Sequence, residues 1–291
     1  MGAWSRNAVD NGNLETIDRI LCILIFFIPR YFHRSPRRAD TGPSGLPITA
    51  VGSYRGGTRK GLDLTIGSPI ASQTPHAAVT IRGGVLLRTV RLREENKVIC
   101  GPSLLVDELL RLSSAPTLDH LVNTTWNGDI FALSSPTSPR GTFMYLQRAT
   151  RGPSAGKVPI VYRSPRIGLD LSNPNTTESI VDPRVAFVGK PYRYFTRPGL
   201  LAYKGRAQTF VGLYNMLMES EGYAEDSMEL KKALRDILGL GEQNVSKYMA
   251  DYRSGYQFGK LKPFIGRSGK GVCQSATEYL RMMGALRKAL Q

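Results

Sequence analysis

The chain has 291 residues, of which 41% are hydrophobic and 21% charged, and its formal net charge is +16. This composition excludes a polar disordered chain and is sufficient for one large folded domain or two smaller ones. The three cysteines are far apart without a C-x-x-C pair, and the three histidines lack H-x-x-x-H spacing. These patterns argue against a disulfide framework or a zinc ribbon, so we expect neither a metal nor a cofactor.

The first 50 residues contain one apolar run and one basic run. Residues 1–19 carry acidic side chains and lack the basic start of a secretory signal. Residues 20–28 are apolar, but a membrane span needs about twenty such residues. We therefore expect no stable membrane insertion, and favour a core strand or buried helix over a targeting or interfacial segment. Residues 30–38 are basic and weakly resemble a nuclear import signal. We expect the protein in the nucleus, with the mitochondrion as the alternative.

Short strands are predicted between residues 54 and 92. A Gly-rich basic turn at residues 54–60 leads into residues 62–66, where apolar and polar residues alternate. Residues 77–81 and 85–92 indicate a hairpin with its turn at Gly83 and Gly84. Arg88 lies within the apolar second strand, so its side chain is expected to be either half exposed or directed into a polar site.

Residues 101–112 predict a helix, because Pro102 suits a first turn and Leu104, Leu105, Leu109 and Leu112 form an apolar stripe. Ser103 stands at its N-terminal end, where amide groups could receive a phosphate. Simple capping of the helix is the alternative role for this serine. A basic loop at residues 148–157 and a strand at residues 158–162 follow.

The segment of residues 163–206 combines basic and aromatic side chains. The wider range 140–206 carries 12 basic and 3 acidic side chains, so it supplies +9 of the net charge of +16. Tyr192, Tyr194, Phe195 and Tyr203 lie between the basic residues. Cations neutralise phosphates and aromatic rings stack on bases, so this pattern favours a nucleic-acid partner over a merely solvated basic face.

Helices are predicted for the C-terminal region, residues 207–291. Capping boxes are expected at Asp226-x-x-Glu229, which opens a helix over residues 228–238, and at Ser275-x-x-Glu278, which opens one over residues 275–290. A further helix is expected at residues 242–252. The two neighbouring helices at residues 228–238 and 242–252 could form a helix-turn-helix-like pair, but a plain helical hairpin is favoured.

Four runs occur in an order that resembles a known family. V-L-L-R ends at Arg88, G-P-S-x-L opens at Gly101, P-R-I-G-L spans residues 165–169, and K-P-Y-R-Y-F spans residues 190–195. Together they resemble the alkyladenine (3-methyladenine) DNA glycosylases over roughly residues 54–200. The resemblance implies a monofunctional enzyme that flips a damaged purine out of the duplex and hydrolyses its N-glycosidic bond.

The resemblance also assigns roles to individual residues. Arg88 would bind the attacking water, and the main-chain carbonyl of Ile167 would hold it. The catalytic glutamate of the family has Glu15 as its one candidate, although the surrounding sequence departs from the family pattern. The departure leaves open a non-catalytic module that has lost the general base; Asp63 and Asp170 are other acids near the relevant segments. The residues expected to contact DNA are Tyr54, Arg55, Arg59, Lys60, Ser103, Arg166, Lys190, Arg193 and Tyr194.

The sequence thus predicts an α+β fold with a mixed, mostly antiparallel sheet and surrounding helices, extended by C-terminal helices. We expect a divergent segment at residues 1–50, a glycosylase-like DNA-binding domain at 51–206 and a helical extension at 207–291. The expected partner is double-stranded DNA, bound by a monomer. An RNA-binding protein is a third possibility that the charge allows.

Overall fold

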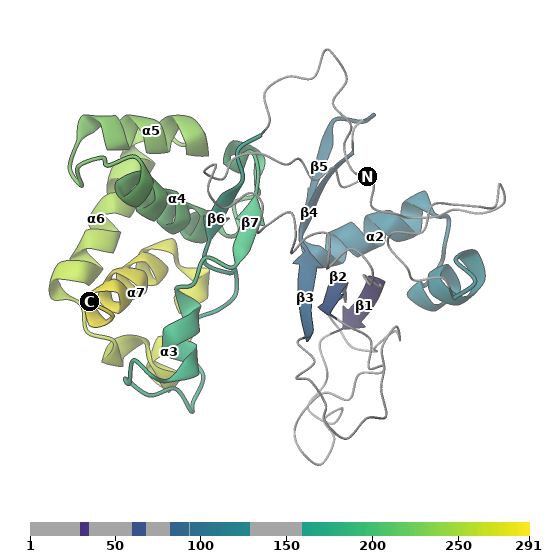
Figure 1. The fold of residues 1–291 in the computed structure, drawn as a ribbon, viewed down its shortest axis with the longest axis horizontal. Coiled ribbons are helices and arrows are strands. Elements are labelled where there is room, and N and C mark those ends of the chain that lie inside the picture. The colour runs from purple at the N-terminus through teal and green to yellow at the C-terminus, as the bar shows by residue number, and fades with distance from the viewer. Residues whose placement is uncertain (1–29, 35–59, 68–81, 93, 129–158) are drawn as a thin grey trace. The chain divides into compact units, whose positions relative to one another are not determined.

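The computed structural model describes residues 30–34, 60–67, 82–92, 94–128 and 159–291. The chain divides into two compact units, Met1–Val158 and Pro159–Gln291 (Figure 1). Both consist of helices and small antiparallel sheets, which confirms the α+β class in its general form. The boundary that we expected between residues 206 and 207 falls inside the second unit, where α4 begins.

The described residues of the first unit form two small sheets. Strands β1 (Arg30–Arg34), β2 (Lys60–Gly67) and β3 (Arg82–Leu87) form an antiparallel sheet in that order. Strands β4 (Thr89–Leu92) and β5 (Lys97–Cys100) form an antiparallel pair. The expected strand at residues 62–66 is therefore confirmed within β2. The predicted turn at Gly83 and Gly84 is wrong, because both glycines lie in β3 and pair with Ile66 and Thr65.

Helix α2 (Pro102–Leu112) confirms the helix expected after Gly101. Leu105 and Val106 are buried against Leu62 of β2, in a core completed by Leu121 and Trp126 around a π-helix (His120–Thr125). The predicted apolar stripe is only partly correct, since the side chains of Leu104 and Leu112 are 59% and 50% exposed. Leu105 and Leu109 of the stripe do pack in this core, so the face that α2 turns to it is shifted from the predicted one but overlaps it.

The second unit begins with irregular and extended segments and ends in helices. Its first part holds β6 (Tyr162–Ser164), α3 (Pro183–Val188), β7 (Arg193–Phe195) and a 3₁₀ turn (Pro198–Leu200). Helices α4 (Arg206–Ser220), α5 (Met228–Leu238), α6 (Glu242–Phe258) and α7 (Ala276–Ala289) follow, with three 3₁₀ turns (Lys262–Phe264, Gly266–Gly269 and Val272–Gln274) between α6 and α7.

The helices enclose one apolar core, whose largest members include Phe210, Tyr214, Leu230, Leu234, Tyr252, Tyr279 and Leu280. Helices α6 and α7 approach closely at Gly255 and Gly284. A side chain at Gly255 would overlap the carbonyl oxygen of Arg281, and one at Gly284 would overlap that of Tyr252. The absence of side chains at these two positions lets the helix backbones meet and closes the core on this side.

The two predicted capping boxes have different outcomes. Ser275 accepts a hydrogen bond from the amide of Glu278 at 3.2 Å, as expected for α7. The cap of α5 is Ser227 and not Asp226, because the Ser227 hydroxyl accepts from the amide of Leu230 at 3.1 Å. Asp226 instead forms an ion pair with Arg253 of α6, which explains why its carboxylate does not cap the helix.

Candidate nucleic-acid interface

Strands β6 and β7 form a short ribbon whose inner face lies against α4 (Figure 1). Side chains alternate between the two faces of a strand, and Ser164 and Arg193 form one cross-strand pair. Arg193 donates to the hydroxyls of Ser164 at 3.3 Å and of Thr209, on α4, at 2.8 Å. Its guanidinium also lies 4.6 Å from the centre of the Phe195 ring. Arg193 therefore joins the ribbon to α4. We had expected it to contact DNA, but its side chain lies on the inner face of the ribbon and not on the exposed one.

A glycine allows the ribbon to lie close to α4. A side chain at Gly212 would overlap the carbonyl oxygen of Arg163 and the side chain of Ser164. The ribbon backbone therefore rests directly on the helix. This contact fixes which face of the ribbon points away from the core.

The outer face of the ribbon carries Arg163 and Tyr194, which are directly opposite each other across the strands. Both side chains are exposed, with Tyr194 52% exposed. The Arg163 guanidinium lies over the Tyr194 ring, 5.4 Å from its centre. A cation and an aromatic ring are thus held together at the surface by the register of the two strands.

A second pair of this kind lies at the start of α4. Tyr203 is 71% exposed, and the guanidinium of Arg206, the first residue of α4, lies 5.4 Å from the centre of its ring. Between them, Gly205 has a φ of 95°, a left-handed conformation that favours glycine. The side chain of Ile167 occupies the space beside Gly205 that a Cβ would fill. The P-R-I-G-L run after β6 is therefore packed against the turn that carries Tyr203.

We call the group formed by these two pairs and their exposed basic neighbours the basic–aromatic surface; it consists of Arg163, Arg166, Tyr194, Tyr203, Lys204 and Arg206. Among the described residues, none of its cations lies within ion-pair distance of a carboxylate. The first turn of α4 contains no acidic residue, so the positive end of the helix dipole adds to this charge. The surface is consequently suited to an anionic partner.

The acidic residues nearest in sequence are committed to turns. Asp182 caps α3, where its carboxylate accepts from the amides of Thr177 and Arg184, each at 2.8 Å. The hydrogen bonds from those two amides hold the pKa of Asp182 below its usual value. Asp170 accepts from the amide of Ser172 at 2.9 Å and from its hydroxyl at 2.5 Å. These carboxylates stabilise the backbone next to the surface without forming ion pairs with its cations.

Asp170 also meets Cys273, which precedes α7. Burial opposes ionisation of Asp170, but hydrogen bonds from Ser172 and Cys273 outweigh it and lower its pKa. Burial and the neighbouring Asp170 together raise the pKa of the Cys273 thiol to about 12. The thiol is therefore protonated at neutral pH, and it donates to the carbonyl of Leu169 at 3.2 Å. This contact ties the P-R-I-G-L run to the C-terminal helices.

The protonated state of Cys273 leads to a test by alkylation. Only the thiolate reacts, and a pKa raised to about 12 lowers the thiolate fraction at pH 8. We expect iodoacetamide to modify Cys273 at least on the order of a hundredfold more slowly in the folded protein than in urea. Peptide mass mapping at timed intervals measures both rates. Asp170→Ala should accelerate the reaction of the folded protein, and equal rates in the folded and unfolded protein would contradict the assignment.

In the first unit, Lys60, Arg88 and Ser103 come together at the start of α2. The amide of Gly101 donates to the carbonyl of Arg88 at 2.7 Å, and the Ser103 hydroxyl donates to the carbonyl of Lys60 at 3.1 Å. The ammonium group of Lys60 forms an ion pair with Asp107 of α2. The V-L-L-R and G-P-S-x-L runs are thus adjacent, and Ser103 is engaged by the backbone of β2.

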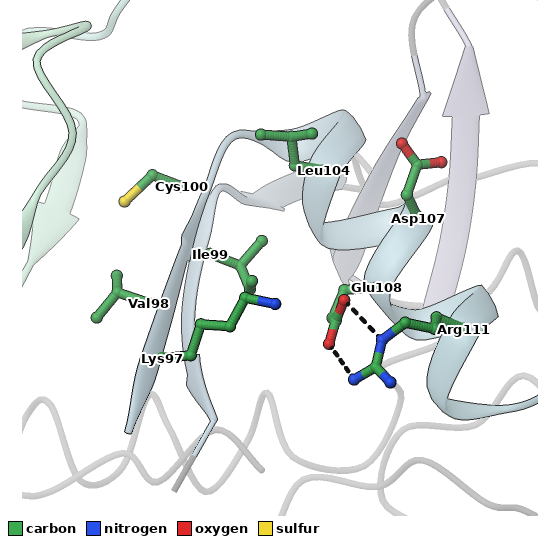
Figure 2. A pocket seen from close by; sticks show the side chains of 8 residues that line it. All are labelled: Lys97, Val98, Ile99, Cys100, Leu104, Asp107, Glu108 and Arg111. Carbon is green, nitrogen blue, oxygen red and sulfur yellow. Dashed lines mark hydrogen bonds and ion pairs between the residues drawn. The ribbon is translucent and has the colours of Figure 1, made fainter. Parts of the chain in front are cut away.

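A pocket of about 370 Å³ lies between β5 and α2 (Figure 2), lined by Lys97, Val98, Ile99, Cys100, Leu104, Asp107, Glu108 and Arg111. Glu108 is buried and accepts two hydrogen bonds from Arg111, at 3.1 and 2.6 Å. The Arg111 hydrogen bond is the main cause that lowers the pKa of Glu108. The sequence interpretation missed this pair, although the i, i+3 spacing of opposite charges was a signal for it. This ion pair therefore stabilises helix α2.

Several predicted site residues are not tested by this geometry. Glu15, Tyr54, Arg55 and Arg59 lie outside the described residues. Arg88 and Ile167 belong to different units. Lys190 and Arg166 are exposed, as a DNA contact requires.

In the described part of the chain, no helix has the length and apolar character of a membrane span, and no cluster of His, Cys, Asp or Glu side chains could hold a metal ion.

Comparisons of the chain with protein-family models, with curated proteins and with solved structures give no match.

Proposed function

We propose that this chain is a DNA-binding protein of the base-excision type, which hydrolyses the N-glycosidic bond of alkylated or deaminated purines. The observation that carries the proposed DNA partner is the basic–aromatic surface, where the exposed Arg163 and the partly exposed Arg206 lie beside exposed tyrosines without carboxylate partners in the described residues. Phosphates would provide the negative charge that no described residue supplies to these cations. The proposed chemistry, the methylpurine-glycosylase-like fold and a nuclear location rest on the sequence resemblance.

The contacts between the resembling runs support this proposal. In the first unit, V-L-L-R touches G-P-S-x-L through the hydrogen bond from Gly101 to Arg88. In the second unit, P-R-I-G-L directly follows β6, and K-P-Y-R-Y-F ends in β7, the partner strand of β6. Within the first unit two of the runs are thus joined by a hydrogen bond, and within the second unit the other two runs adjoin a pair of strands.

In the proposed mechanism, two groups of the protein bind the water that attacks the sugar. A purine is flipped out of the duplex, since its glycosidic bond cannot be reached inside the base stack. The sequence resemblance assigns the binding of the attacking water to the Arg88 side chain and to the Ile167 carbonyl. Cleavage develops positive charge on the sugar, which nearby carbonyl and carboxylate oxygens stabilise. Packing of the Ile167 side chain beside Gly205 holds its main chain at the edge of the basic–aromatic surface.

The activity is tested with duplex oligonucleotides that contain a single hypoxanthine or 3-methyladenine. We expect the full chain to release the free base, and Arg88→Ala to lower the single-turnover rate by roughly 100-fold, as for the loss of one water-positioning or charge-stabilising group. Arg91→Ala is the matched control, since Arg91 lies on β4 and donates to Asn96 at 2.9 Å. No release by the wild-type chain would refute the hydrolase, and equal rates for Arg88→Ala and wild type would refute the site.

A non-catalytic module that binds nucleic acid is the second candidate. The observation that favours it is the environment of Asp170, the acid closest to the P-R-I-G-L run. Its carboxylate is engaged by Ser172 and Cys273 and therefore stabilises a turn rather than standing ready as a base. Tight binding of DNA without release of any base would support this candidate.

A further inference from the structure

We propose that Tyr194 and Tyr203 are stacking platforms for unpaired bases, so that the basic–aromatic surface binds DNA with unpaired bases more tightly than intact duplex. This inference rests on the DNA partner of the proposed function, but not on the hydrolysis. It assigns to two tyrosines the base contacts that the phosphate-binding cations cannot make.

The environment of each ring supports this role. A large aromatic side chain is normally buried, or it has a partner at the surface. Tyr194 and Tyr203 remain 52% and 71% exposed, although Arg163 and Arg206 lie over their rings. Exposed area therefore remains on both rings for a second flat group to contact. A nucleobase is such a group, and a neighbouring guanidinium adds a cation–π contribution and a phosphate contact.

Backbone continuity and one side-chain contact link the two tyrosines. Tyr194 is held opposite Arg163 by the register of β6 and β7, and the chain runs from β6 directly into the run that contains Ile167. The Ile167 side chain packs on Gly205, two residues after Tyr203. We expect a DNA strand whose phosphates bind the cations from the ribbon to the start of α4 to pass both rings.

The combination of charges and rings decides between partners. Binding to intact duplex through phosphates requires cations and gives exposed rings no specific role, since the bases are stacked on one another. Single-stranded binding requires both features, because each ring stacks on a base while the cations follow the backbone. An acidic protein segment would match the charge and leave the flat rings unexplained. Single-stranded DNA is thus the partner that accounts for both kinds of residue.

The test compares fluorescence anisotropy of three labelled DNA probes with the full chain: a single strand, the matching duplex, and that duplex with a central unpaired bubble. We expect the wild-type chain to bind the single strand and the bubble more tightly than the duplex. Tyr194→Ala and Tyr203→Ala should each weaken single-strand binding by about 5- to 100-fold, the loss of one stacked base. Duplex binding should change less than threefold. The changes Tyr194→Phe and Tyr203→Phe should retain the affinity, because the ring remains.

Phe258→Ala is the control, since Phe258 is 79% exposed at the end of α6 and outside the surface. Tighter binding of intact duplex by the wild type would overturn the inference, as would equal losses for alanine and phenylalanine variants or the same loss for the control. Tighter binding of RNA than of DNA of the same sequence would overturn the choice of partner. If the tyrosine effects occur but no base is released, the stacking role stands and the hydrolase falls. If bases are released and the tyrosine variants bind normally, the hydrolase stands and the stacking role is refuted.

Discussion

Removing three cations from the basic–aromatic surface, in the variant Arg163→Ala/Arg166→Ala/Lys204→Ala, should weaken DNA binding by roughly 1,000-fold. Hydrogen bonds to charged groups contribute about 1.5 kcal/mol or more each, and about 1.4 kcal/mol is tenfold in affinity. Each phosphate that loses its cation should also reduce the slope of log K against log salt by about 0.9 for duplex DNA, or about 0.7 for a single strand. Binding titrations at several salt concentrations measure both effects.

The matched control removes the same charge elsewhere in the second unit. Lys232, Lys260 and Lys262 are exposed and lie outside the basic–aromatic surface, so Lys232→Ala/Lys260→Ala/Lys262→Ala changes the net charge equally. We expect this control to bind within a few-fold of the wild type. Equal losses in the two triple variants would mean that only the total charge matters and that the surface has no special role.

Gly255→Val should strongly destabilise the second unit. A side chain at this position would overlap the Arg281 carbonyl, and a backbone atom cannot move aside as a flexible side chain can. Helices α6 and α7 must separate, which exposes part of the core that includes Tyr252 and Leu280. We expect a loss of about 3 kcal/mol or more in the free energy of unfolding.

Hydrogen exchange of the amides of α6 and α7 isolates this effect from the first unit. The variant should exchange these amides at least on the order of a hundredfold faster than the wild type. Gly241→Ala is the control, because its φ is −65° and the nearest atom to an added Cβ is the side-chain nitrogen of Asn244 at 3.9 Å. Unchanged exchange in Gly255→Val would show that the close crossing of the two helices is not required for stability.

Local patterns predicted the helices of this protein better than they predicted which faces are buried. Pro102 and Ser275 predict the starts of α2 and α7, because helix starts depend on residues only a few positions apart. The face of α2 was harder to predict, since Leu104 is exposed while Glu108 is buried in its pair with Arg111. Asp226 failed as a cap because Arg253, distant in sequence, takes its carboxylate.

The site was predictable in composition but not in arrangement. The density of basic and aromatic residues is visible in the sequence, and it identified the segment that holds the basic–aromatic surface. The pairing of β6 with β7 is a long-range contact, and it alone decides that Arg193 turns inward to Thr209 while Tyr194 stays outside. Tyr203 was noted as an aromatic residue but not selected as a contact, because its exposure depends on how the turn packs against Ile167.

Within the described part of the chain, the cations of the basic–aromatic surface have no carboxylate partners, and this has a consequence for the free protein. Like charges that share a small area repel one another, and this repulsion is present only when the chain is folded compactly. The region that is best suited to a polyanion is thus a source of self-repulsion in its absence. A bound polyanion would relieve that repulsion and, by binding only the folded chain, shift the folding equilibrium further toward the native state. The second unit is therefore expected to reach its full stability only in the complex.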